Sequence, residues 1–220
     1  MTCNQGLCHR PMERCIEELI KFNTDKVHFV DYLAKHGWAV TTDLLAPSTI
    51  AALSEETNSL WTGAAFKAAG VGRDTNFQVR ADIRSDHILW LDEANLTAPQ
   101  AAYCTAMETL RQELNAQLFV GVQSLEAHYA VYPPGAFYQK HLDRFSTADE
   151  RILSCSLYLN PNWDEADGGA LRLYEGEHFI EIYPHAGTFV LFRSDAIYHE
   201  VLPATRERFS LTGWFKRRSL

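Results

Sequence analysis

The 220-residue chain lacks several features that mark secreted, membrane and nucleic-acid-binding proteins. Its five cysteines form neither an even set nor a C-x-x-C pair, so we do not expect a secreted disulfide framework. No apolar run approaches the length of a membrane span, and residues 1–10 lack the apolar core of a signal peptide. The net charge of −8 argues against a general nucleic-acid binder, whose phosphate contacts require a basic surface. We therefore expect a cytoplasmic protein that binds neither nucleic acid nor membrane.

The composition supports a single folded domain. A hydrophobic fraction of 46% is enough for a substantial core. The length suits one large or two small domains, and all-β barrels of this length commonly remain single. We expect one domain over residues 1–220, in which a helical part, about residues 11–120, packs on a β-rich core, about residues 124–216.

Helical spacing of apolar residues dominates the first half of the chain. It predicts helices over Pro11–Phe22 and Lys26–Lys35, one that starts near Pro47, and the longest from about Pro99 to Phe119. Short strands are expected among them at Trp38–Val40, Asp82–Asp86 and His87–Leu91. The segment Gly63–Arg80 has several glycines and alanines and little periodicity. A connection of this length is either surface slack or a functional loop, and we interpret it as a loop that covers a substrate.

The second half of the chain changes to strands separated by turn sequences. The expected strands are Glu126–Tyr132, Phe137–Asp143, Ile152–Leu159, Ala170–Tyr174, Phe179–Tyr183, Thr188–Phe192 and Arg208–Phe215. Short strands at such spacing are typical of a sandwich or barrel of the jelly-roll kind. The fold class that we expect is α+β and mainly β: a double-stranded β-helix core, jelly-roll or cupin-like, buttressed by the helices.

An H-x-D triplet lies at the end of one of these expected strands. Because residues i and i+2 of a strand project to the same side, His141 and Asp143 are aimed together. A further histidine, His199, follows beyond several strands, where the fold can return it to this pair. Two nitrogens and one oxygen on one face of a metal leave the opposite face open, as in the non-heme Fe(II) oxygenases. We predict that these three residues bind Fe(II).

A cation follows on the last expected strand. Alternation puts Arg208, Ser210 and Thr212 on one face of this strand, with apolar residues on the other. A guanidinium on an inner, polar face calls for a carboxylate partner. We predict that Arg208 holds the distal carboxylate of 2-oxoglutarate, and that Tyr158 donates a hydrogen bond to the same end. The chemistry would be oxidation of a C–H bond by O2, coupled to decarboxylation of 2-oxoglutarate to succinate and CO2.

Each of these residues alone also has a simpler explanation. H-x-D triplets arise by chance, and an arginine on a strand is usually a surface charge. We interpret His128, His178 and His185 as packed or solvated side chains rather than ligands. The prediction depends on the combination, because the triplet, a later histidine and the arginine nine positions on coincide within one β-rich region.

Longer stretches resemble the Fe(II)- and 2-oxoglutarate-dependent prolyl 4-hydroxylases, most closely the type that hydroxylates hypoxia-inducible factor in animals, together with its bacterial relatives. The resemblance covers nearly the whole chain from about Asp25. The similar segments are Asp82–Trp90 (D-I-R-x-D-x-I-x-W), Tyr132–Gly135 (a Y-P-G turn), Tyr158–Trp163 (Y-L-N-x-x-W), Gly168–Arg172 (G-G-x-L-R), and His199–Val201 with Arg208 and Trp214 (H-E-V, R, W).

The resemblance implies a set of cofactors and their binding residues. Fe(II) falls on the same triad, and 2-oxoglutarate on Arg208 and Tyr158. Tyr132, Leu171 and Thr212 would line the co-substrate pocket. The expected oxidant is O2, with ascorbate as an additional reductant.

The resemblance also implies how a substrate is held. The partner would be a protein with a target proline, contacted by Arg84 and Trp214 and covered by the loop at residues 63–80. A salt bridge between Asp86 and Arg151 would anchor this region.

The leading hypothesis is an oxygenase that hydroxylates a prolyl residue of an intracellular protein. Two departures from the family bear on its substrate: the interval from Tyr132 to His141 is one residue shorter than in the animal enzymes, and the covering loop is rich in alanine and glycine. The alternatives are the same chemistry on a free amino acid or other small molecule, a module that senses 2-oxoglutarate or oxygen without catalysis, and a hydrolytic zinc site. The last is disfavoured because no candidate general base accompanies the triad, and Arg208 would have no task.

Overall fold

The structure is a computed structural model that describes residues 26–70, 78–144 and 150–218. Within them, antiparallel sheets pack with three α-helices: α2 (Lys26–His36), α3 (Pro47–Thr62) and α4 (Ala98–Leu118). This part of the chain is mainly β, as expected. None of its helices is both long and apolar enough to cross a membrane.

The larger sheet carries the central strands. Its order is β1-β9-β6-β11-β4-β3-β2, and every pairing is antiparallel. The strand β11 lies between β4 and β6 and pairs with both along its length. The bounds are β1 (Trp38–Thr41), β2 (Lys67–Ala68), β3 (His87–Trp90), β4 (Ser124–Tyr132), β6 (Arg151–Tyr158), β9 (Phe189–Arg193) and β11 (Arg208–Lys216).

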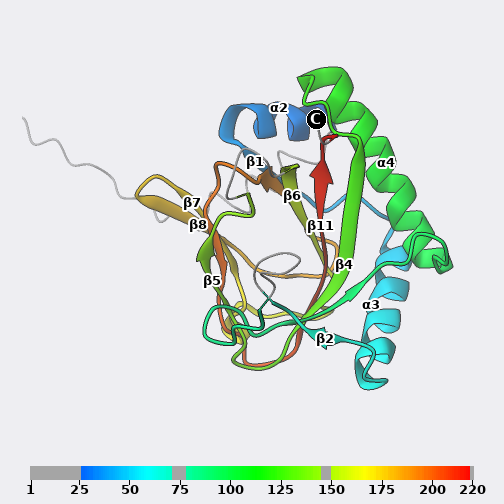
Figure 1. Cartoon of the computed structure of the whole chain (residues 1–220), viewed down its shortest axis with the longest axis vertical. Coiled ribbons are helices and arrows are strands. Elements are labelled where there is room, and N and C mark those ends of the chain that lie inside the picture. Colours follow the sequence, from blue (N-terminus) through cyan, green and yellow to red (C-terminus); the bar gives the residue numbers. More distant parts are fainter. Residues whose placement is uncertain (1–25, 71–77, 145–149, 219–220) are drawn as a thin grey trace, which may run out of the picture.

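The smaller sheet faces the larger one across a shared apolar core. Its order is β5-β10-β7-β8, again antiparallel, with β5 (Tyr138–His141), β7 (Leu171–Glu175), β8 (His178–Ile182) and β10 (His199–Val201). Leu171, Leu173 and Ile182 of this sheet pack with Val190 and Phe192 of the larger one. Figure 1 shows β5, β7 and β8 on the side of the molecule away from α3 and α4.

A second core lies between the helices and the larger sheet. Alternation along β9 explains how one strand serves both cores: Phe189 and Leu191 pack with the helices, whereas Val190 and Phe192 face the smaller sheet. A strand buried on both faces carries a continuous apolar run instead of alternating polarity. The layers are therefore helices, larger sheet and smaller sheet (Figure 1).

Most of the expected elements are confirmed to within a few residues. The helices at 26–35, from 47 and at 99–119 are α2, α3 and α4, and Gly37 ends α2 with a left-handed φ of 79°. The prediction of a strand at Asp82–Asp86 was wrong, because this segment is a turn that makes one isolated bridge, from Arg84 to Tyr138. The short strands β2 and β10 were not predicted. The expected helix Pro11–Phe22 and residues 71–77 of the covering loop lie outside the described residues.

Candidate metal centre

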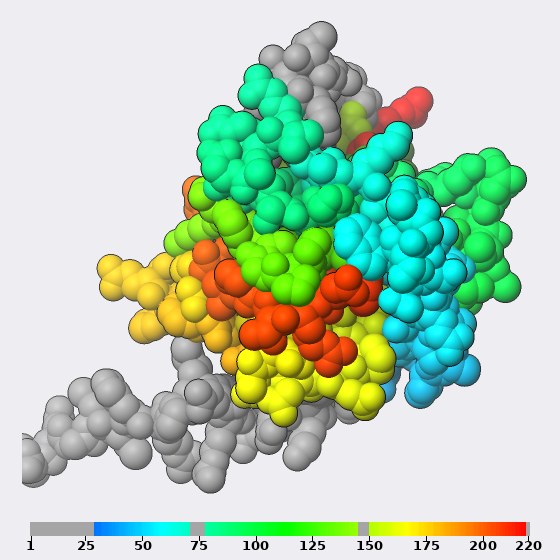
Figure 2. Space-filling view, turned by 90° about the horizontal axis from the view of Figure 1, so that it is seen from below, coloured from blue at the N-terminus to red at the C-terminus, as the bar shows by residue number. Residues whose placement is uncertain are grey.

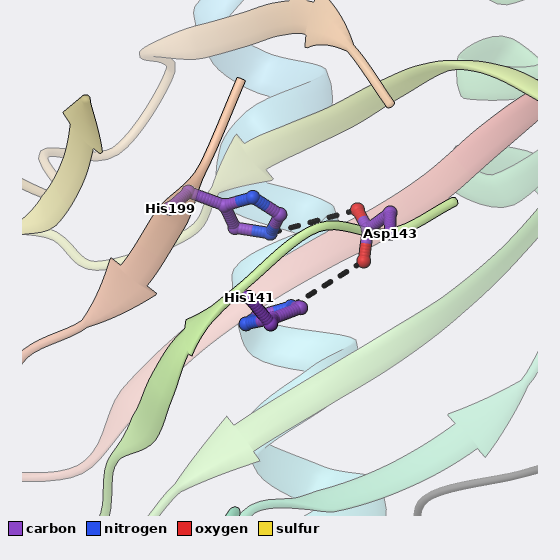
Figure 3. Close-up of side chains that lie close together, drawn as sticks. All are labelled: His141, Asp143 and His199. Atoms are coloured by element: carbon purple, nitrogen blue, oxygen red, sulfur yellow. Dashed lines mark ion pairs between the residues drawn. The ribbon is translucent and has the colours of Figure 1, made fainter. Parts of the chain in front are cut away.

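Three predicted ligands lie together at the edge where β5 and β10 pair. His141 is the last residue of β5 and His199 is the first of β10, and the two are register partners. Asp143 follows two residues after His141, and its carboxylate lies between the two rings (Figure 3). Its Oδ1 is 3.4 Å from His141 Nε2 and its Oδ2 is 3.6 Å from His199 Nε2. One donor atom from each residue lies within 4.8 Å of the others, which makes the triad a potential metal site.

Backbone carbonyls orient both imidazoles toward this centre. His141 Nδ1 is 2.7 Å from the carbonyl oxygen of Gln139, and His199 Nδ1 is 3.2 Å from that of Ile197. Because a carbonyl only accepts hydrogen bonds, each Nδ1 carries the proton and each Nε2 presents its lone pair. His141 Nε2 is buried without a hydrogen-bond partner among the described residues, as a metal ligand would be.

The electrostatics of the triad favour metal binding over protonation. Burial raises the pKa of Asp143, but His199, His141 and a hydrogen bond with Ser154 outweigh it and hold the carboxylate ionised. Burial, with His141 beside it, lowers the pKa of His199 to about 4, so this ring is neutral at pH 7. A carboxylate and imidazoles with free Nε2 lone pairs are the donor set of a facial non-heme iron site.

A buried cation lies in the same cavity as the triad. The cavity has a volume of about 50 Å³ and is lined by both histidines, Asp143 and Arg208. Arg208 is 2% exposed, and its Nε donates to the carbonyl oxygen of Gly169 at 2.8 Å. No carboxylate of the described residues forms an ion pair with it. An unpaired buried charge is strongly destabilising, so this guanidinium calls for an anionic ligand.

Two tyrosines surround this guanidinium. Its Cζ lies 4.8 Å from the ring centroid of Tyr158 and 5.2 Å from that of Tyr132. The Tyr158 hydroxyl is buried without a hydrogen-bond partner in the described structure. The residues therefore fit a dicarboxylic acid, since one carboxylate can accept hydrogen bonds from both Arg208 and Tyr158 while the other end extends toward the metal.

Glycines explain how the chain closes around Arg208. Figure 2 shows the turn after β4, the segment before β11 and the segment before β7 side by side on one face. Gly135 donates to Ala204, and Gly169 donates to Pro203. At Gly169, where φ is 71°, an added Cβ would lie 3.2 Å from Cδ of Arg208 and 3.0 Å from Cβ of Ala204. Only glycine fits this backbone without displacing the arginine.

The other predicted site residues surround the same cavity, and their roles remain proposals. Tyr132, Leu171 and Thr212 line it, as do the predicted substrate contacts Arg84 and Trp214. The cavity faces of the strands follow from alternation, since Phe209, Leu211 and Phe215 of β11 pack on the helix side.

The predicted salt bridge between Asp86 and Arg151 was wrong. Both oxygens of Asp86 accept from Arg84, with Nε to Oδ1 at 2.7 Å. Arg151 instead pairs with Glu126, Nη2 to Oε1 at 2.9 Å, and its guanidinium lies 3.5 Å from the ring centroid of Trp214. Arg84 and Asp86 are two residues apart, so alternation would also have aimed them together; the expectation of Arg151 as the partner came from the family resemblance.

The sequence did not predict that three residues, Tyr138, Ser154 and His128, line the cavity. The Tyr138 ring stacks on His141 with centroids 3.6 Å apart and an interplanar angle of 20°. Ser154 bonds to Ser194 at 2.9 Å and helps to hold Asp143 ionised. His128 is packed against Trp90 and Trp214, as expected, but it also lines the cavity, which was not expected. Counting in twos from Tyr132 along β4 would have placed His128 on this face.

Comparisons with known proteins identify relatives of the chain. The 2OG-Fe(II) oxygenase superfamily profile matches residues 127–216. The hypoxia-inducible factor prolyl hydroxylase of Caenorhabditis elegans is 32% identical over 87% of this chain, and the chain spans 28% of that relative's length. The crystal structure of a Pseudomonas putida prolyl-4-hydroxylase is 41% identical, with 86% of this chain and 97% of that one covered and a TM-score of 0.79.

A further solved structure supports the fold. It is a prolyl hydroxylase from Trichoplax adhaerens in complex with a hypoxia inducible factor oxygen degradation domain peptide fragment. The alignment covers 94% of this chain and 94% of that one, with a TM-score of 0.78 and 24% sequence identity.

Proposed function

The chain belongs to the Fe(II)- and 2-oxoglutarate-dependent prolyl 4-hydroxylases of the 2OG-Fe(II) oxygenase superfamily, and from this membership we propose that it hydroxylates a prolyl residue of a protein substrate. The observation that carries the proposal is the buried Arg208, without an ion pair in the described structure, in one cavity with a His-Asp-His set. A structural arginine would have an acidic neighbour, and a simple metal site would not need the arginine.

Each residue has a defined task in this function. His141, Asp143 and His199 would hold Fe(II), which with 2-oxoglutarate and O2 supplies the oxidation of a C–H bond and yields succinate and CO2. Arg208 and Tyr158 would bind the distal carboxylate of 2-oxoglutarate. Their burial excludes water from this contact and strengthens it.

The side walls would determine how the diacid lies. Tyr132, Leu171 and Thr212 line the cavity, so they would confine the carbon chain between Arg208 and the triad. The Thr212 hydroxyl is already engaged, at 3.0 Å from Ser156 Oγ and 3.2 Å from Ser210 Oγ. These contacts fix its orientation, so it presents a preorganised polar wall.

The charges at the substrate side favour a peptide over a free amino acid. Besides the triad, Arg208 and His128, two acidic or basic side chains line the cavity: Arg84 and Asp86. These two neutralise each other through paired hydrogen bonds, and the Asp86 side chain is fully buried. A zwitterionic amino acid would need both charges free for its own ammonium and carboxylate. A proline within a peptide has neither charge, and Arg84 and Trp214 would contact it.

Ala69 and Gly70 of the expected covering loop contact this charge pair. Arg84 Nη1 lies 3.5 Å from the carbonyl oxygen of Gly70, and Ala69 donates to the carbonyl of Asp86. These contacts place the described part of the loop at residues 63–80 beside the cavity, where we propose that the loop holds the target proline.

We also propose the finer description of the fold and its setting. The two facing antiparallel sheets suit a double-stranded β-helix of the jelly-roll kind, buttressed by the helices and forming one domain over residues 1–220. A cytoplasmic location is supported by Cys104 and Cys155, which are both free.

The test is oxidation of peptides by the purified protein. Incubation with Fe(II), 2-oxoglutarate, O2 and a panel of proline peptides, which includes the hypoxia-inducible factor fragment, should add one oxygen atom to proline and release succinate. The matched control is His199→Ala, which should do neither. Brisk succinate release on free proline with no peptide oxidised would favour the small-molecule alternative, and no turnover on any substrate would favour the sensing module.

A further inference from the structure

A third histidine lies in the cavity with no assigned task. His128, on β4, is 2% exposed and lines the cavity with Thr212 and Trp214. Its Nδ1 is buried without a hydrogen-bond partner, and so is Nε1 of the neighbouring Trp214. We propose that His128 is a substrate-positioning residue, which together with the indole N–H of Trp214 binds the backbone amide beside the target proline. This inference rests on the proposed function.

Packing accounts for the faces of this imidazole but not for its edge. The ring centroid of Trp90 lies 4.8 Å from that of His128, and the centroid of Trp214 lies at 5.4 Å. An indole offers one N–H donor and no acceptor, and the Trp214 nitrogen does not bond to His128. Two adjacent polar atoms are thus buried without partners, although folded proteins satisfy nearly all such atoms.

The protonation state of His128 suits an amide. Burial, with Arg84 next in effect, lowers the pKa of His128 to about 3, so the ring is neutral at pH 7. A neutral imidazole has one donor and one acceptor nitrogen. A peptide group is uncharged and offers one N–H and one carbonyl oxygen, so Nδ1 of the neutral ring and the Trp214 N–H match a peptide better than a carboxylate or an ammonium.

The strand register separates this subsite from the one for 2-oxoglutarate. Arg208 is the partner of Tyr132, whereas His128 is the partner of Thr212, four residues further along the same pair of strands. Four residues of strand span about 13 Å at about 3.3 Å each. The four C–C bonds of a five-carbon diacid extend about 5 Å. A five-carbon diacid held by Arg208 is therefore too short to reach along the strands to His128, whose register partner Thr212 lines the cavity beside both subsites.

The experiment compares His128→Leu, which removes both nitrogens at similar volume, with His128→Gln, which keeps a donor and an acceptor. The matched control is His178→Leu on β8, an exposed histidine outside the cavity. The probes are N-acetylated, C-amidated proline peptides, with 2-oxoglutarate affinity measured separately by anaerobic titration. His128→Leu should raise the KM for peptide about tenfold, the value of one hydrogen bond. His128→Gln should stay within about threefold of the wild type.

The outcomes separate this inference from the proposed function. A peptide KM unchanged in His128→Leu, or a fall in melting temperature with no change in peptide KM, would overturn the positioning role and leave the function intact. Loss of 2-oxoglutarate affinity in place of peptide affinity would also overturn it. If the wild type oxidises no peptide, the proposed function fails and the inference fails with it.

Discussion

Replacement of Arg208 by methionine perturbs the co-substrate contact most selectively. The Nε of Arg208 donates to the carbonyl oxygen of Gly169, so Nη1 and Nη2 remain for the distal carboxylate of 2-oxoglutarate. Hydrogen bonds to charged groups contribute about 1.5–3 kcal/mol each, so the loss of two should cost about 3 kcal/mol or more. That corresponds to a dissociation constant raised at least about a hundredfold. Arg208→Lys retains a point charge but not the fork, and should lose about tenfold.

The stability of the free protein should respond differently. Arg208→Met removes the bond to Gly169, but it also removes a buried charge that has no ion pair in the described structure. These effects oppose each other, so the melting temperature without ligand should stay within about 4 °C of the wild type. The rise in melting temperature that saturating 2-oxoglutarate gives the wild type should disappear.

The assay is an anaerobic titration of the Fe(II)-loaded protein with 2-oxoglutarate, with melting temperatures recorded beside it. A dissociation constant for Arg208→Met within threefold of the wild type would refute the assignment of the carboxylate to this residue. A large loss of stability without ligand would show instead that Arg208 is a structural residue.

Three further predictions follow from the same contacts. His199→Ala should abolish turnover and weaken Fe(II) binding by more than about a hundredfold in a metal titration, since it removes a ligand; retained affinity would place the metal elsewhere. Tyr158→Phe should raise the KM for 2-oxoglutarate about tenfold without lowering the melting temperature of the free protein, because its hydroxyl has no partner there; a destabilised variant would contradict this. Gly169→Ala should lower the melting temperature by about 2–8 °C and weaken 2-oxoglutarate binding, because its Cβ would press on Arg208. Gly135→Ala, with a similar φ of 79° and open space around its Cβ, is the control and should leave binding unchanged.

Local periodicity was enough to predict the strands that carry the site, except β10, which carries His199. Alternation along β11 correctly placed Arg208, Ser210 and Thr212 on the cavity side and Leu211 on the helix side. Such a pattern is readable because one face of the strand packs on helices while the other faces a polar cavity. The same reasoning aimed His141 and Asp143 together, and the register of β5 with β10 brings His199 to them.

The contact between Arg84 and Asp86 was overlooked. Arg84 was expected on a strand, but the chain turns at residues 81–83, and Arg84 pairs with Asp86. Because the two residues are i and i+2, either a strand or a turn can bring them together, and the expected partner Arg151 came from the family resemblance rather than from the local sequence. The strand β10 was missed because its three residues are too few to show alternation.

The environment of His128 depended on distant packing. Its sequence neighbours alternate as in any buried strand, whereas its contacts with Trp90 and Trp214 come from distant parts of the chain. Alternation from Tyr132 places His128 on the cavity face, but it does not show that the Nδ1 of this ring lacks a hydrogen-bond partner among the described residues.

The most direct measurement is a crystal structure of the protein with Mn(II) in place of Fe(II) and with 2-oxoglutarate bound. The account predicts one metal ion coordinated by His141, Asp143 and His199, with the distal carboxylate of the diacid on Arg208 and Tyr158. A metal bound away from these three side chains, or a diacid whose distal carboxylate does not contact Arg208, would contradict it.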